Sequence, residues 1–266
     1  MEAKRQDWDY IHTRVAEARG TGARNPALEW RWHHIFRLLR VDAMQNDIRF
    51  IDIGCGDGAF LRRFCVNYPL AKVAGVDGSR EGSDRAKTAM PEGIFREIDL
   101  DSANLIVPAE LLQFGNIAVC TEVLEHLDDP IQGLKNALKL LSPGARLVIT
   151  VPAGPMSASD RYFGHRKHYS VAELDVELQQ AGFCLKGIWA AGFPFHTLYR
   201  LIVLLRGART IDDQIGNPGL MTAFMTKSLF AIFSLLFRLN LFWPKFGWQI
   251  FAVAEVPPEP AGRGGA

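Results

Sequence analysis

The sequence has few cysteines, and no two of them are spaced as a metal or redox motif. The four cysteines are Cys55, Cys65, Cys120 and Cys184, and none of them forms a C-x-x-C pair. Each lies in an apolar or glycine-rich run, which is typical of reduced thiols in a cytoplasmic protein. We therefore expect mostly buried, unpaired thiols rather than a disulfide framework.

A charge surplus and long apolar runs are missing too. The chain has 30 Lys and Arg against 29 Asp and Glu, whereas a broad nucleic-acid footprint needs a basic surplus, so we expect no nucleic-acid partner. No stretch reaches the roughly 18 apolar residues of a spanning helix. The nearest candidate, around Leu229 to Phe237, lies between Lys227 and Arg238. The charged first residues predict no signal peptide.

The dominant pattern from Arg49 onward is alternation of short β-type and helical segments. This alternation predicts a parallel sheet with helices on both faces. The expected strands are 49–53, 72–77, 94–98, 117–121, 146–151, 184–191 and 248–256. The expected helices are 28–39, 59–66, 81–89, 131–141 and 171–181.

A glycine-rich turn follows the first expected strand. Gly54, Gly56 and Gly58 come directly before a helix that begins near Ala59. Glycine permits a tight turn and close approach to a ligand, and a helix start presents unpaired N–H groups. Gly54, Gly56 and Ala59 also match a dinucleotide fingerprint, so a nicotinamide-dependent oxidoreductase competes at this point.

Two carboxylates narrow the choice of ligand. Asp52 lies inside the strand end, where it suits an ammonium group and would repel a pyrophosphate. Asp77 ends the next strand, where a carboxylate can accept ribose hydroxyl protons. The alternative for Asp77 is a helix N-cap.

The stretch from Asp52 to Gly58, together with Asp77, resembles the first two motifs of class I S-adenosylmethionine-dependent methyltransferases. Residues 97–101, 119–130 and 141–149 resemble three later motifs of that family, in the expected order. The resemblance implies S-adenosylmethionine as cofactor. It also implies a Rossmann-like, seven-stranded, mostly parallel sheet, with an apolar helical insertion between the last two strands.

The resemblance assigns roles around the cofactor. The glycines would pass under its methionine part and Asp52 would act near its amino group, through water or neighbouring backbone. Asp77 would hold the ribose, and Asp99 the adenine amino group with Leu100 against the ring. Asp101 is the alternative to Asp99, and loop capping is the alternative for both. The full expected set is Asp52, Gly54, Cys55, Gly56, Gly58, Asp77, Gly78, Asp99, Leu100, Thr121 and Glu122.

Methyl transfer requires alignment of the nucleophile, the methyl group and the sulfur, and an oxygen or nitrogen nucleophile can also need a base. The candidates, all after the fourth or fifth strand, are His168, His165, Glu122 and His126. Imidazole titrates near neutrality and so suits this role. The alternative is that these side chains make local hydrogen bonds or cap the next helix.

A divalent metal is the alternative to metal-free catalysis. Glu122, Glu125 and His126 with His165 or His168 would offer two carboxylates and two imidazoles. The layout is similar to that of plant small-RNA 2′-O-methyltransferases, and less fully to that of ubiquinone-pathway O-methyltransferases. It departs from them in its second half, where only His-x-x-His matches.

The segment 193–247 is unusually apolar, with helices expected over 193–205 and 221–242. Three interpretations compete: a layer packed on the domain or on a second subunit, a lid over an apolar acceptor, or an in-plane membrane anchor. Helices apolar on most faces are hard to hide, so we expect some affinity for lipid.

The sequence thus predicts an N-terminal helical cap (1–48), a methyltransferase domain (49–192 and 248–256), the insertion (193–247) and a disordered tail (257–266). The expected function is S-adenosylmethionine-dependent methylation of a small or lipid-linked acceptor, with oxygen as the expected atom. We expect a cytoplasmic protein, at the membrane surface if the insertion is an anchor. The competing functions are a catalytically silent cofactor-binding or membrane scaffold, and the oxidoreductase.

Overall fold

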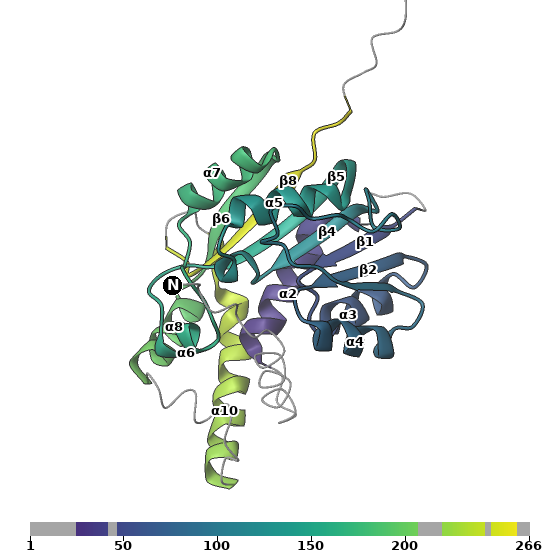
Figure 1. Cartoon of the computed structure of the whole chain (residues 1–266). Helices are drawn as coiled ribbons and strands as arrows, with labels where there is room; N and C mark the ends of the chain where they lie inside the picture. The colour runs from purple at the N-terminus through teal and green to yellow at the C-terminus, as the bar shows by residue number, and fades with distance from the viewer. Residues whose placement is uncertain (1–24, 42–46, 207–219, 243–245, 260–266) are drawn as a thin grey trace, which may run out of the picture.

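The computed structural model describes residues 25–41, 47–206, 220–242 and 246–259 (Figure 1). Most of the expected N-terminal cap, the middle of the insertion and most of the expected tail therefore lie outside the described residues.

One mixed sheet of eight strands, in the order β3-β2-β1-β4-β5-β8-β6-β7, forms the centre of the molecule. Five neighbouring strands are parallel: β3 (Ile94–Glu97), β2 (Lys72–Asp77), β1 (Arg49–Ile53), β4 (Gly115–Thr121) and β5 (Leu141–Pro152). The other three, β8 (Gln249–Glu255), β6 (Cys184–Phe193) and β7 (Leu241–Phe242), are antiparallel. The order reverses between β1 and β4, and ligands of open α/β sheets bind at such a switch point. The predicted Rossmann-like architecture is confirmed.

The sheet has eight strands rather than the predicted seven. The extra strand, β7, lies in the insertion and pairs with the end of β6, where Phe193 is opposite Leu241. The second insertion helix was expected to reach 242, but α10 (Leu220–Leu236) ends earlier and a 3-10 turn, η3 (Phe237–Leu239), follows it. This stretch is apolar at both helical and strand spacing, so periodicity could not locate the change.

Strand β5 begins five residues before the predicted start at 146. The run Ser142-Pro143-Gly144 was expected only to stop the preceding helix, α5 (Pro130–Lys139). Instead Leu141 already pairs with Gly115, and the register shifts before Arg146 pairs with Ile117. Gly144, at φ +76°, allows that irregularity, and its N–H donates to the carbonyl of Val256.

Helices cover both faces of the sheet, as predicted (Figure 1). One face carries α5 and α7 (Val171–Ala181), whose Leu134, Leu174 and Leu178 are fully buried. The other carries α2 (Pro26–Leu39), α3 (Ala59–Asn67) and α4 (Arg80–Ala89). Truncating one fully buried leucine to alanine typically lowers the free energy of unfolding by about 2–5 kcal/mol. The helices on each face are therefore firmly packed against the sheet.

The insertion packs on the second face through α2. Phe237 in η3 lies against Trp30 of α2, with ring centroids 6.2 Å apart, and α10 extends below the body in Figure 1. The first insertion helix, α8 (Phe195–Arg206), follows β6 directly. Helix α2 therefore joins the insertion to the sheet in addition to strand β7, which pairs with β6.

No helix among the described residues combines the length and the hydropathy needed to cross a bilayer.

Candidate active site

The glycine turn after β1 is held against β2 by its backbone. The N–H groups of Gly54 and Cys55 both donate to the carbonyl oxygen of Val76, at 2.7 and 3.0 Å. Gly54 has φ +82°, and a Cβ there would lie 2.2 Å from Cγ2 of Val123. Only glycine meets both demands, so the turn packs directly on the segment that follows β4.

Asp77 ties the end of β2 to this turn. Its carboxylate accepts the N–H of Gly56 and the N–H of Ser79, both at 2.8 Å. The N-cap of α4 is Ser79, whose side chain accepts from Gly82, so Asp77 is not the cap. Gly78 lies between Asp77 and Ser79 in the chain. The carboxylate is thus fixed beside the glycine turn, where the resemblance expects the ribose.

Asp52 is buried beneath the turn, and its Oδ1 has no hydrogen-bond partner in the described part of the chain. Burial raises the pKa of Asp52 to about 8, and the carboxylates of Asp77 and Asp57 contribute to the rise. A buried carboxyl with a spare acceptor oxygen fits a ligand that carries an ammonium group. This orphaned atom is consistent with the aminoacyl part of S-adenosylmethionine.

Both members of the acidic pair after β3, Asp99 and Asp101, accept backbone N–H groups of nearby loops. Asp101 accepts the N–H groups of Asp128 and Asp129, at 3.1 and 3.0 Å, so it holds the loop before α5. That is the loop-capping alternative. Asp99 is half-buried and accepts the N–H of Asp101 at 3.1 Å. Leu100 packs into the core under α5.

Glu122 follows half-buried Thr121 at the end of β4. Three side chains from distant segments bind its carboxylate. Its carboxylate pairs with Nη1 of Arg31 at 2.7 Å and accepts from the Gln249 amide and the Thr150 hydroxyl, at 2.9 and 3.2 Å. Its φ of +57° is unusual for a residue with a side chain. Burial acts to raise the pKa of Glu122, but Arg31 and the Gln249 amide outweigh it and lower the pKa.

Sequence reasoning missed Arg31, Thr150 and Gln249. Gln249 had a weak signal, because it is a polar residue at the start of an apolar strand, but nothing local pointed Arg31 at Glu122.

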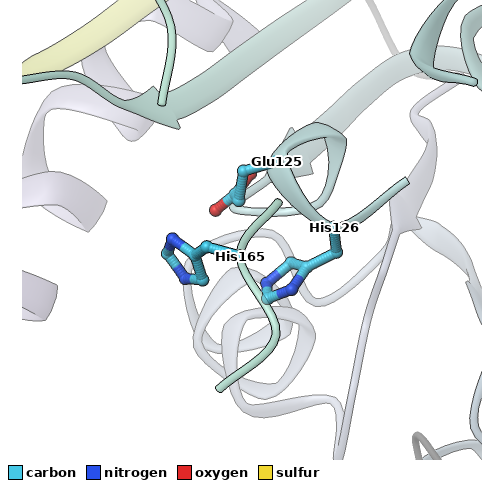
Figure 2. Close-up of side chains that lie close together, drawn as sticks. All are labelled: Glu125, His126 and His165. Carbon is cyan, nitrogen blue, oxygen red and sulfur yellow. The ribbon is translucent and has the colours of Figure 1, made fainter. Parts of the chain in front are cut away.

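Glu125, His126 and His165 come together from two segments (Figure 2). Each offers one ligand atom, and these atoms lie within 4.8 Å of one another. Glu125 is fully buried, and neither of its oxygens has a partner among the residues described. Burial, with the nearby Glu122 carboxylate, raises the pKa of Glu125 well above its usual range. Arg166 holds the segments together, since its N–H donates to the Glu125 carbonyl and its Nε to the His126 carbonyl, both at 2.8 Å.

His165 and His168 form a second group with Asp160, which lies in the short helix α6 (Ala158–Tyr162). His165 Nδ1 is 3.3 Å from His168 Nε2, and His168 Nδ1 is 2.9 Å from the Gly154 carbonyl oxygen. Burial lowers the pKa of His165 to about 4 and also lowers that of His168. The predicted four-ligand set is therefore not assembled as one group: Glu122 points to Arg31, and His168 groups with Asp160.

Comparison with known proteins agrees with this geometry. A family model described as "Methyltransferase domain" matches residues 24–185, which is more than half of the chain. The ubiquinone biosynthesis O-methyltransferase of Coxiella burnetii is 27% identical over 128 residues, which cover 46% of this chain and 53% of that one. The chain spans about half the length of the curated relatives it matches.

Solved structures share the fold at low identity. The structure of a Haloferax volcanii methyltransferase bound to its activator Trm112 has a TM-score of 0.57 at 17% identity, covering 92% of this chain and 95% of that one. A phosphoethanolamine N-methyltransferase from Haemonchus contortus, solved with S-adenosylhomocysteine, has a TM-score of 0.53 at 18% identity, covering 85% and 53%. The strand order, the glycine turn with its carboxylates and the family match together show that this chain belongs to the class I S-adenosylmethionine-dependent methyltransferases.

Proposed function

We propose that the chain transfers a methyl group from S-adenosylmethionine to an oxygen atom of a small or lipid-linked acceptor, and that His165 takes up the acceptor's proton. The observation that carries the proposal is the hydrogen-bond chain from Gly154 through His168 to His165, beyond the carboxyl end of β5. Ligands of this class of sheet bind in the crevice outside those strand ends.

The hydrogen bonds select one of the two histidines. A carbonyl oxygen only accepts, so His168 Nδ1 carries the hydrogen that it donates to Gly154. In the neutral ring, His168 Nε2 then accepts from His165 Nδ1. His165 is left with a lone pair on Nε2, as a base requires, whereas both nitrogens of His168 are occupied. The lowered pKa of each ring keeps both neutral at pH 7.

The other candidates have supporting roles in this proposal. Glu122 is held by Arg31, Gln249 and Thr150 and has a lowered pKa, so it shapes the pocket rather than taking a proton. The His126 ring lies edge-on to His165, with centroids 4.7 Å apart, and lines the same side.

The cofactor is proposed to lie across the glycine turn. Asp52 faces its amino group, Asp77 its ribose and Asp99 its adenine. The remaining residues proposed to contact it are Gly54, Cys55, Gly56, Gly58, Gly78, Leu100, Thr121 and Glu122. Once bound, the sulfonium supplies an activated methyl group, so this chain has to provide only alignment and the base.

A second candidate is metal-assisted transfer, favoured by the two unpartnered oxygens of Glu125. With His126 and His165 they form a mixed oxygen and nitrogen site suited to a divalent cation. His165 would then bind the metal through the nitrogen that otherwise acts as base. Calorimetry with Mg²⁺, Mn²⁺ and Zn²⁺ separates the two candidates, because only the metal site predicts binding that Glu125→Gln abolishes.

The lipid-linked acceptor is supported by apolar side chains exposed on the insertion, which we call the insertion surface. It consists of Phe193, Leu198, Leu201, Leu205, Ile232, Leu235, Leu239, Leu241 and Phe246. The segment 193–247 contains six Lys and Arg but two Asp, which suits anionic headgroups. Two relatives are named for ubiquinone biosynthesis and for demethylmenaquinone. We propose that this surface rests on the cytoplasmic face of a membrane and that a homodimer is the alternative occupant.

The test is transfer of the methyl group from labelled S-adenosylmethionine into a lipid and small-molecule extract. His165→Gln should keep cofactor binding by calorimetry and lose transfer by at least 100-fold, the range of general base catalysis. His33→Gln, an exposed histidine on α2, is the matched control and should change neither. Cofactor binding without any transfer by the unaltered protein would instead support the silent scaffold.

A further inference from the structure

The region where α2, α8 and the segment after η3 meet contains several residues with buried polar atoms that have no partner. Among the described residues, five such atoms lie there: Trp30 Nε1, Arg31 Nε, His196 Nδ1, Thr197 Oγ1 and Asn240 Nδ2. We call these five residues the junction cluster. Each buried donor or acceptor left without a partner costs about 1–3 kcal/mol, so five at one junction indicate a missing polar partner.

His196 contacts two other members of the cluster, Trp30 and Asn240. Its ring stacks on Trp30, with centroids 5.0 Å apart and an interplanar angle of 25°. Its backbone N–H donates to Oδ1 of Asn240 at 3.1 Å, and Thr197 is the next residue of α8. Arg31 follows Trp30 and reaches Glu122 at the end of β4. The cluster therefore borders the strand ends at which the methyl group is proposed to be transferred.

The unpartnered atoms are mostly donors. An indole Nε1, a guanidinium Nε and an amide Nδ2 can only donate, and a threonine hydroxyl can donate or accept. Asn240 uses its Oδ1 for the N–H groups of Phe195 and His196, which leaves only its amino group. The missing partner must therefore offer hydrogen-bond acceptors.

The local charges are already balanced. Arg31 pairs with Glu122, and Arg200 pairs with both oxygens of Asp160, at 3.1 and 2.8 Å. Burial lowers the pKa of His196 to about 3, so that ring is neutral at pH 7. An anion would enter as an uncompensated buried charge, which is costly. A neutral oxygen has no such cost, and the rings of Trp30, His196 and Phe237 give it apolar surroundings.

We propose that the junction cluster binds the methyl acceptor through neutral oxygen atoms, so that the acceptor is an uncharged aromatic or apolar molecule bearing carbonyl, ether or hydroxyl groups. This inference rests on the proposed function, because it takes the occupant of the junction to be the methyl acceptor. The donors Trp30, Arg31 and Asn240 fix the orientation of the acceptor beside Glu122.

Three probes of similar size separate the possible chemistries: acetophenone, benzoate and ethylbenzene. Each is titrated into the full chain saturated with S-adenosylhomocysteine, while the indole N–H of Trp30 and the side-chain amide of Asn240 are followed by ¹⁵N NMR. Trp30→Phe assigns the indole signal. Acetophenone should shift both signals and bind at least 10-fold more tightly than ethylbenzene or benzoate.

Two variants remove single donors with little change of shape. Thr197→Val removes the hydroxyl, and Asn240→Asp removes the amino group while keeping the oxygen that caps α8. Thr197→Val should weaken acetophenone binding about 2- to 12-fold, as expected for one lost hydrogen bond. Asn240→Asp should weaken it further, because its carboxylate puts an acceptor against the carbonyl oxygen of the probe. Thr88→Val removes a hydroxyl that donates to the Asp84 carbonyl on α4, and should have no effect.

Equal affinity for acetophenone and ethylbenzene, preference for benzoate, or an unshifted Trp30 signal at saturation would overturn the inference. Those outcomes leave the proposed function standing if S-adenosylhomocysteine binds. Failure of S-adenosylhomocysteine to bind counts against the proposed function alone, because the probe titration without it still reports on the junction cluster.

Discussion

At Gly54, both the backbone conformation and the packing require a residue without a side chain. It has φ +82°, and a Cβ would collide with Val123. Gly144 has a similar φ of +76° but no atom within 4 Å of its Cβ position. A side chain at Gly54 would therefore meet both backbone strain and a steric clash, whereas one at Gly144 would meet backbone strain alone.

Gly54→Ala should lower both stability and cofactor affinity, whereas Gly144→Ala should lower stability alone. A left-handed alanine costs about 1–2 kcal/mol, which applies to both variants. The displaced Val123 adds a further loss at Gly54, and its movement distorts the turn under the cofactor. Urea unfolding and calorimetry with S-adenosylhomocysteine measure the two effects. Equal loss of affinity in both variants would contradict the proposed place of the cofactor.

Asp52 should release a proton when S-adenosylmethionine binds. Its pKa of about 8 means that the carboxyl is protonated at pH 7, and a cationic amino group nearby would lower that pKa. Binding should therefore release up to about one proton. The number comes from calorimetry in buffers with different ionisation enthalpies. Asp52→Asn should release none, and a wild-type value of zero would place the amino group elsewhere.

At the scale of helices and strands, the Arg200–Asp160 pair joins the insertion to the histidine loop. Asp160 also forms a capping box with Ser157. Burial raises the pKa of Asp160, but Arg200 and Ser157 outweigh it and hold the pKa at about 2. Because this pKa is depressed, the pair stabilises the fold above about pH 4, and the contribution is lost as the pH falls from about 4 to 2.

Arg200→Met should lower the free energy of unfolding by about 3 kcal/mol at pH 7, because it leaves a buried carboxylate unpaired. Arg200→Lys should cost less, since it keeps one charge-assisted bond. Adding Asp160→Asn to Arg200→Met should recover part of the loss. Urea unfolding checks all three, and additive losses in the double variant would show that the pair is not coupled.

The sequence predicted the elements whose signals are local. The glycine turn, the strand-end carboxylates and the alternation of strands and helices are each readable within about thirty residues, and they gave the fold and the family. Strand β7 and the early start of β5 depend on pairing with distant strands, so no local pattern marked them. Arg31 and Gln249 were missed for the same reason, since their role exists only once α2 and β8 meet Glu122.

For the molecule as a whole, the insertion surface carries the proposal of a membrane contact. Leu205 and Leu235 on it are 78% and 63% exposed. Leu70, between α3 and β2, is 96% exposed and does not belong to this surface. Exposed apolar side chains that group together often mark a membrane or protein contact. We expect the protein to bind vesicles that contain anionic lipid.

Flotation with phosphatidylglycerol vesicles tests this expectation. Replacing Leu205 and Leu235 with Glu should reduce binding at least 10-fold, because two charges would enter the apolar boundary. Leu70→Glu is the matched control and should bind like the unaltered protein. The alternative is that a second copy of the chain covers the insertion surface. A dimer seen by sedimentation that is lost in the Leu205→Glu/Leu235→Glu variant and is unaffected by lipid would show this.

The contacts of Glu122 with Arg31 and Gln249 also affect the order in which the protein folds during synthesis. The carboxylate of Glu122 is held from one side by Arg31 of α2 and from the other by Gln249 of β8, 127 residues beyond it. A ribosome that has produced the whole glycine turn and β1 to β5 has therefore not yet produced a complete pocket. The parallel part of the sheet can therefore form first, whereas the pocket is complete only once β8 has been synthesised.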